Sequence, residues 1–167
     1  MALNALGELA RLTGDCALSS TFYNESMQLF QETGFKLAVA LVSVNLGEVA
    51  LQERDFIRAI SLFSQSLEIF RQLENPRGLQ ACLEGFASVA AFEGKYKQAA
   101  QLFGTVQISH ETMGRTMDPA DEMEYSRCIA YVREHLDPTT FNKAWAEGMK
   151  MSVNEALHLA LKTVEET

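Results

Sequence analysis

The chain has 167 residues, of which 47% are hydrophobic and 22% are charged, and both values are typical of globular proteins. Its formal net charge is −8, which disfavours direct nucleic-acid binding, because that requires clustered Lys and Arg to replace condensed counterions. The sequence shows neither an apolar run of about 18 residues nor a basic, apolar leader, so we expect a cytoplasmic protein that does not bind membranes.

The first two thirds of the sequence follow a repeat with a period of 40 residues. When the chain is aligned with itself at this offset, residues of the same kind coincide, which indicates a repeat architecture. The coinciding residues are Leu6, Leu46 and Phe86; Gly7, Gly47 and Ala87; Ala10, Ala50 and Ala90; Ser19, Ala59 and Ala99; Tyr23, Phe63 and Phe103; and the turn pairs Gly14-Asp15, Arg54-Asp55 and Gly94-Lys95. Three copies are therefore predicted, at about residues 1–32, 33–73 and 74–110.

Each copy is predicted to fold as two helices joined by a short turn. In the second copy, apolar residues recur at spacings of three and four before the turn, as at Leu46 and Val49, and after it, as at Phe63 and Leu67. Glycine inside a helix costs about 1 kcal/mol relative to alanine. Its recurrence at one register of the first helix therefore predicts that two helix backbones approach closely there.

The helix register also predicts where the first helix should begin. The second copy's first helix is predicted to start near Lys36, after the break at Gly34, so its counterpart would start about four residues before Met1. This predicts that the chain is a fragment of a longer array or multidomain protein. The alternative is a first helix that is naturally frayed.

After His110 the period ends, and residues 111–167 are predicted to form three capping helices. Each has a start signal, namely Asp118-Pro119, Asp137-Pro138 and the capping box of Ser152 and Glu155. We expect these helices to cover the open apolar face of the third copy, as the ends of solenoids require.

The single tryptophan lies in the stretch AWAEGMKMSVNEAL, residues 144–157. Phe141 and Trp145 are one helical turn apart, which predicts that Trp145 anchors the core. Gly148 is typical of a helix that ends in a left-handed residue. The stretch is therefore interpreted as the joint between two helices rather than as a binding loop.

Residues 45–70, NLGEVALQERDFIRAISLFSQSLEIF, resemble the tetratricopeptide repeat, with a Leu-Gly pair in the first helix and Ala followed four residues later by Phe in the second. The resemblance covers residues 1 to about 110. It implies an all-α fold, a right-handed α-α superhelix of about three helix pairs, which with the capping helices would form a single structural domain. Two departures stand out: Ala87 replaces the usual Gly, and the period exceeds the usual value of about 34. The longer period implies roughly 9 Å of additional helix or loop per copy.

Residues 141–161, FNKAWAEGMKMSVNEALHLAL, are similar to the end of the tetratricopeptide-like arrays of large bacterial signal-transduction ATPases and transcriptional regulators, including fusions of LuxR or SARP type. Residues 99–114 resemble their final repeat. In that family the array follows an ATPase domain, which is often fused to a DNA-binding or other effector domain. The resemblance implies a regulatory module. Since no GxxxxGK[ST] motif is present, any NTPase would have to lie outside this sequence.

Aligning the sequence with the repeat predicts a polar, concave groove on the first helices of the copies. Its predicted partner-binding residues are Asn4, Glu8, Arg11, Asn45, Glu48, Gln52, Glu84 and Ser88. The excess of carboxylates suits a protein or peptide segment that is basic or amphipathic, although a polar small ligand and a merely solvated face are alternatives. Asn4, Val44 and Glu84 stand where some of these repeats carry a carboxylate-binding pattern, so chaperone-tail binding is not predicted.

The sequence predicts no catalytic residue, no metal site and no cofactor. His110, His135 and His158 match no HExxH motif. The three cysteines form no CxxC pair, so buried, reduced thiols are predicted for Cys16, Cys82 and Cys128. The carboxylates Asp121, Glu122 and Glu124 are interpreted as a solvated helix start.

These observations favour a non-catalytic protein–protein interaction or scaffolding module. The resemblance implies that it is the sensor or regulatory segment of a bacterial signalling or transcriptional regulator. One alternative is a domain that senses a small inducer. Another is a homo-oligomer formed through the first helix, around Leu3 and Leu6. An enzyme is the least favoured interpretation.

Overall fold

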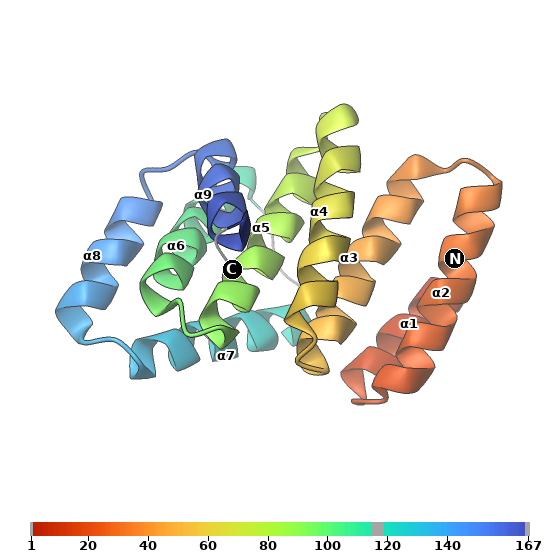
Figure 1. The fold of residues 1–167 in the computed structure, drawn as a ribbon, viewed down its shortest axis with the longest axis horizontal. Helices are drawn as coiled ribbons and strands as arrows, with labels where there is room; N and C mark the ends of the chain where they lie inside the picture. Colours follow the sequence, from red (N-terminus) through yellow and green to blue (C-terminus); the bar gives the residue numbers. More distant parts are fainter. Residues whose placement is uncertain (1, 115–118, 166–167) are drawn as a thin grey trace. The chain divides into compact units, whose positions relative to one another are not determined.

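The computed structural model describes residues 2–114 and 119–165, and all regular secondary structure in these ranges is helical (Figure 1). The helices are α1 (Ala2–Leu12), α2 (Cys16–Glu32), α3 (Lys36–Gln52), α4 (Phe56–Gln72), α5 (Pro76–Phe92), α6 (Tyr96–Met113), α7 (Pro119–Glu134), α8 (Pro138–Gly148) and α9 (Val153–Glu165). The predicted all-α fold of paired helices is confirmed. Asp118, the predicted N-cap of α7, lies outside the described residues.

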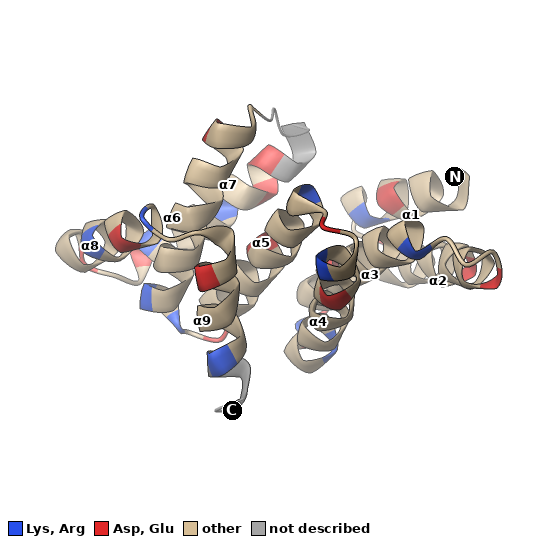
Figure 2. Ribbon diagram, turned by 90° about the horizontal axis from the view of Figure 1, so that it is seen from above, with Lys and Arg blue, Asp and Glu red and all other residues tan. Residues whose placement is uncertain are grey.

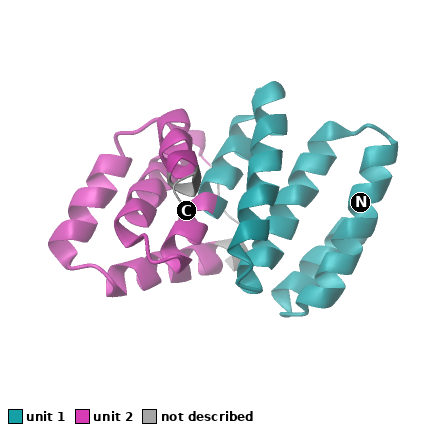
Figure 3. Cartoon of the chain, viewed as in Figure 1, with its two compact units in different colours: residues 1–85 teal, residues 86–167 magenta. Residues whose placement is uncertain are grey.

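The chain divides into two compact units, residues 1–85 and residues 86–167 (Figure 3). The first unit holds α1 to α4 and the beginning of α5, and the second holds the end of α5 and α6 to α9. The boundary therefore falls inside a single helix, within the third predicted copy of the repeat.

Helix length explains the long period of the repeat. Helices α2 to α5 each have 17 residues, and linkers of three residues separate the helices from α1 to α6. Two such helices with their linkers give the observed 40-residue period, compared with about 34 in the usual repeat. The additional residues lie in longer helices rather than in longer loops.

One part of the first unit's core lies between α2 and α3. Tyr23, Val42, Leu46 and Val49 form a buried cluster, because α2 and α3 turn their apolar faces toward each other. The partly buried residues that pack against this cluster are Cys16, Met27, Phe30 and Leu62.

The recurring glycines mark close helix contacts, although their nearest neighbours are aromatic rings rather than the second helix backbone that was predicted. A Cβ atom at Gly7 would lie 2.7 Å from the Tyr23 ring, and one at Gly47 would lie 2.5 Å from the Phe63 ring. Gly85 in α5 meets the same Phe63 ring, so this aromatic side chain is held between two glycines. At these positions the first helix of a pair has no side chain, and this leaves room for the aromatic ring of the second helix.

A residue in the left-handed conformation occurs once every 20 residues, at the end of each helix from α1 to α6. The residues are Gly14, Gly34, Arg54, Glu74, Gly94 and Gly114. Four are glycine, for which this conformation is not strained, whereas Arg54 and Glu74 adopt it with φ of 62° and 48°.

Replacing Glu74 by glycine is expected to raise the free energy of unfolding by about 1 kcal/mol, because the strain of the left-handed backbone is removed. Urea denaturation followed by circular dichroism measures the change. Glu74→Ala is the matched control, since it removes the side chain and keeps the Cβ atom. Equal stabilisation by both variants would show that the side chain, not the backbone conformation, is responsible.

In the second unit, α6 packs against α7, α8 and α9. Its closest contact is with α8, where a Cβ atom at Gly148 would fall on the Gln101 carbonyl group and one at Gly104 would fall on the Trp145 carbonyl oxygen. The Thr105 hydroxyl donates a hydrogen bond to the Gly148 carbonyl oxygen over 2.7 Å. The two backbones approach here because both helices carry glycine.

The structure corrects the interpretation of Gly148. This residue is the last of α8, and the capping residue that follows, Met149, is right-handed with φ of −60°. The glycine is needed for close packing on α6 rather than for a left-handed turn. Trp145 is half-buried and stacks on the buried Phe141 ring at 5.4 Å between centroids, so the side chain fully enclosed in the core is Phe141.

The predicted starts of α8 and α9 are confirmed. The Asp137 carboxylate accepts a hydrogen bond from the Thr140 amide over 3.0 Å. Ser152 and Glu155 form the reciprocal capping box, with the Ser152 amide 2.7 Å from the Glu155 carboxylate. Hydrogen bonds from Thr140 lower the pKa of Asp137, and those from Ser152 lower the pKa of Glu155.

Candidate functional site

A buried arginine joins α1 to α3 in the first unit. The Arg11 side chain is only 1% exposed, and its Nη2 atom lies 2.6 Å from Glu8 Oε1. Its Nε atom lies 3.4 Å from Glu48 Oε2 in α3. Both glutamate side chains are 37% exposed, so the guanidinium is enclosed while the carboxylates reach the surface.

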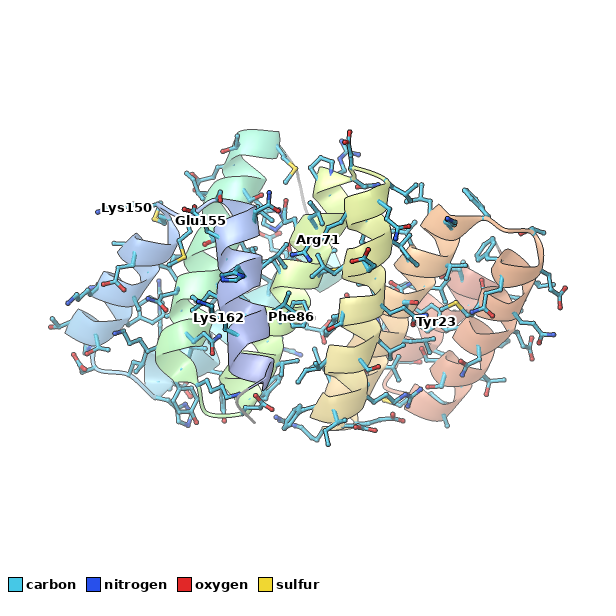
Figure 4. All side chains as sticks on the ribbon, turned by 45° about the horizontal axis from the view of Figure 1, so that its top comes forward. Tyr23, Arg71, Phe86, Lys150, Glu155 and Lys162 are labelled. Carbon is cyan, nitrogen blue, oxygen red and sulfur yellow. The ribbon has the colours of Figure 1, made fainter. Side chains whose placement is uncertain are left out.

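Tyr23 of α2 completes this cluster. Its hydroxyl group donates a hydrogen bond of 2.7 Å to Glu8 Oε2, although its ring is fully buried. Figure 4 shows the position of Tyr23 among the first helices of the chain. Burial and the adjacent Glu8 carboxylate raise the pKa of Tyr23 well above its ordinary value. The hydroxyl therefore remains protonated and acts as a donor, and Glu8 is held from two sides.

A second polar bridge lies beside the first. The Asn45 side-chain amide in α3 donates a hydrogen bond of 3.2 Å to Asn4 Oδ1 in α1. Together, Glu8, Arg11, Glu48 and the two asparagines form a strip of polar groups across α1 and α3, which we call the α1–α3 polar strip. Its formal charge is −1, since two carboxylates face one guanidinium.

The three remaining groove candidates, Gln52, Glu84 and Ser88, make polar contacts with other residues. Gln52 is exposed, and its Oε1 atom lies 3.5 Å from the Cys16 thiol of α2. Glu84 accepts a hydrogen bond of 3.2 Å from Gln80, one turn earlier in α5. Ser88 belongs to the second unit, where its hydroxyl lies 3.9 Å from the Cys128 thiol. A partner-binding role for any of the eight residues stays a prediction.

The helix pairs can be compared with known families. Residues 1–72 and residues 36–106 each match the pattern of the tetratricopeptide repeat, and together they cover well over half of the chain. The chain belongs to the tetratricopeptide repeat family. This family consists of interaction repeats without catalytic activity of their own.

Curated relatives of this tetratricopeptide repeat chain are bacterial. Proteins of Mycobacterium bovis and of two strains of Mycobacterium tuberculosis, each named as a candidate HTH-type transcriptional regulator, are 24% identical to it over 160 residues. The match covers 93% of this chain but only 17% of each relative, so the chain spans about a sixth of their length. No solved structure matches significantly.

Two features of the polar strip could have been recognised from the repeat register. Arg11 aligns with Leu51 and Ala91, both of which are buried, so a charged residue at this position must find partners inside the array. Tyr23 aligns with Phe63 and Phe103, and a buried hydroxyl needs an acceptor. The hydrogen bond between the Tyr23 hydroxyl and Glu8 was not predicted from the sequence.

The cysteines of this tetratricopeptide repeat chain differ in exposure. Cys82 and Cys128 are buried, as predicted, and burial raises the pKa of Cys82 to about 12. Cys16 is only partly buried, so the prediction is wrong for this residue, which lies at the first position of α2.

Three further features concern metal binding, membrane spans and cavities. Within residues 2–114 and 122–162, no group of three or more His, Cys, Asp or Glu is arranged to hold a metal ion. Over the same ranges, no helix is long and apolar enough to cross a membrane. In the second unit, a hollow lined by Phe86, Gln98 and Ala160 has a volume of about 10 Å³, which is enough for one water molecule.

Proposed function

We propose that this chain is the protein-binding sensor or regulatory segment of a bacterial transcriptional regulator. Membership of the tetratricopeptide repeat family supports an interaction role, and the similarity to mycobacterial proteins named as HTH-type regulators supports the regulatory context. The chain spans only part of those proteins, so the DNA-binding output belongs to other segments of such a regulator.

The observation that carries this proposal is the α1–α3 polar strip. Its positive group, Arg11, is enclosed, whereas the carboxylates of Glu8 and Glu48 are partly exposed. The charge presented to a partner is therefore negative, and Figure 2 shows an acidic position on α1. The side chains of Asn4 and Asn45 are partly exposed beside them and have capacity for further hydrogen bonds.

A peptide segment with basic side chains fits these groups. Lysine or arginine would pair with the exposed carboxylate edges, and an extended peptide backbone would bond with the asparagine amides. Because the contacts are charged and lie at the surface, their main effects would be on specificity and on the association rate.

The proposal predicts that a basic amphipathic peptide binds the chain more tightly than the same peptide with each Lys changed to Glu. Fluorescence anisotropy with labelled peptides measures both affinities at two salt concentrations. We expect Glu48→Gln to weaken binding of the basic peptide by about fivefold to tenfold, which corresponds to roughly 1 kcal/mol. Binding should also weaken as salt is raised.

Glu25→Gln is the matched control, because Glu25 is an exposed carboxylate in α2, outside the strip. It should leave the affinity unchanged. Equal binding of both peptides, or equal weakening by both variants, would contradict the proposed role of the strip.

Two alternative functions, small-molecule sensing and self-association, can be distinguished from peptide binding by other measurements. Saturable thermal stabilisation by a metabolite, without any protein partner, would favour small-molecule sensing. The hollow in the second unit gives no support to that alternative, because it holds one water molecule at most. A concentration-dependent mass that is lost when Leu3 or Leu6 is changed to a charged residue would favour self-association through α1.

A further inference from the structure

The outward face of α1 is apolar along the whole helix. Leu6, Leu9 and Leu12 are 43%, 60% and 50% exposed, and two exposed alanines, Ala2 and Ala5, lie among them. The only charged residues of α1 belong to the α1–α3 polar strip, on the opposite side of the helix. An exposed apolar face without charge typically marks an interaction surface.

The repeat shows what kind of surface this face resembles. The residues 40 positions later in the sequence lie on α3, where Val42, Leu46 and Val49 are buried. The corresponding pairs are Ala2 and Val42, Leu6 and Leu46, Leu9 and Val49, and Leu12 and Gln52. On α3, therefore, the same face is covered.

The covering element on α3 is the helix α2. The residues of α2 that pack against the buried α3 cluster are Cys16, Tyr23, Met27 and Phe30. The exposed Gln52, at the end of this face, also contacts Cys16. The counterpart of Gln52 on α1 is Leu12, so the α1 face is more apolar than the face that α2 already covers.

The correspondence between α1 and α3 extends to their other contacts. Gly7 of α1 meets the Tyr23 ring of α2, and Gly47 of α3 meets the Phe63 ring of α4. The two helices are therefore oriented in the same way within their pairs. Residues that match in the register also match in the direction they face.

We propose that the α1 apolar face, formed by Ala2, Leu6, Leu9 and Leu12, docks an amphipathic helix of the same kind as α2. The partner helix would present large apolar residues at the spacing of Cys16, Tyr23, Met27 and Phe30. The contact is apolar, so its affinity depends little on salt. It lies on a different face of α1 from the polar strip, and it does not depend on the function proposed for that strip.

A peptide with the sequence of residues 16–32, carrying Cys16→Ser and a fluorescent label, tests this proposal against the whole chain. We expect saturable, salt-insensitive binding by fluorescence anisotropy, with a gain in helical circular dichroism, since an isolated peptide of this length is only marginally helical. The double variant Leu6→Lys and Leu9→Lys should weaken binding at least tenfold. A peptide with Tyr23→Ser and Phe30→Ser should lose it.

Ile57→Lys is the control, because Ile57 is an isolated apolar side chain on α4 that is 84% exposed. It should leave the affinity unchanged, and thermal melts should show that all the variants fold. Binding that persists in the Leu6/Leu9 variant would mean that the peptide displaces α2 instead, and it would overturn the proposal. Absence of binding even at high peptide concentration would also overturn the proposal. A dimer that the Leu6/Leu9 variant abolishes and that the peptide cannot disrupt would overturn it as well.

Discussion

Replacing Gly148 by alanine is expected to lower the free energy of unfolding by about 3 kcal/mol. The new Cβ atom would fall on the Gln101 carbonyl group of α6, which is backbone and cannot rotate away as a side chain would. Relief requires α8 to move off α6, which would also break the Thr105 hydrogen bond to the Gly148 carbonyl oxygen. Trp145, the only tryptophan, lies one turn before this contact, so its fluorescence reports unfolding of the second unit directly.

Asn142→Ala is the matched control, because Asn142 is exposed on the same helix. It should be neutral or slightly stabilising, as alanine is the best helix former. If the Gly148→Ala protein were as stable as the Asn142→Ala protein, the backbone of α8 at Gly148 could not lie against the Gln101 carbonyl group of α6.

Replacing Arg11 by methionine is expected to lower the free energy of unfolding by about 3 kcal/mol. This value is at the low end for breaking a buried ion pair, because the two carboxylates remain partly hydrated. The change removes the guanidinium and leaves Glu8 and Glu48 without their shared cation. Methionine keeps most of the buried volume, so the loss reflects charge rather than a cavity. Urea denaturation followed by circular dichroism measures it.

The control is Arg58→Met, since Arg58 pairs with Glu53 at 3.1 Å with both side chains more than a third exposed. Such a surface pair contributes less than about 1 kcal/mol. Adding Glu48→Gln to Arg11→Met should restore part of the lost stability, because it removes one of the two carboxylates. An Arg11→Met variant no less stable than Arg58→Met would show that Arg11 is not a structural bridge.

Much of the fold follows from the sequence because each helix pair is local. The turn pairs Gly14-Asp15, Arg54-Asp55 and Gly94-Lys95 all separate helices in the structure, and the capping box at Ser152 opens α9. Signals of this kind involve residues a few positions apart, so the sequence displays them directly.

The errors arose where a residue has a contact that the sequence does not display. Gly148 fits both a left-handed helix end and a close backbone approach, and only the position of α6 decides between them. The groove residues were placed on their helices by the register, but the ion pairs that join Arg11 to Glu8 and Glu48 depend on the distance between α1 and α3. Exposed charge therefore could not be distinguished from paired charge.

The uniform length of the helices and linkers has a consequence for how such a chain can change over time. Helices α2 to α5, each of 17 residues and joined by three-residue linkers, place equivalent residues at the two ends of a 40-residue block. A block can be gained or lost whole while its neighbours keep the same kind of junction, because each block packs mainly on adjacent ones. Gene duplication can therefore lengthen or shorten this array without the need to redesign its interior.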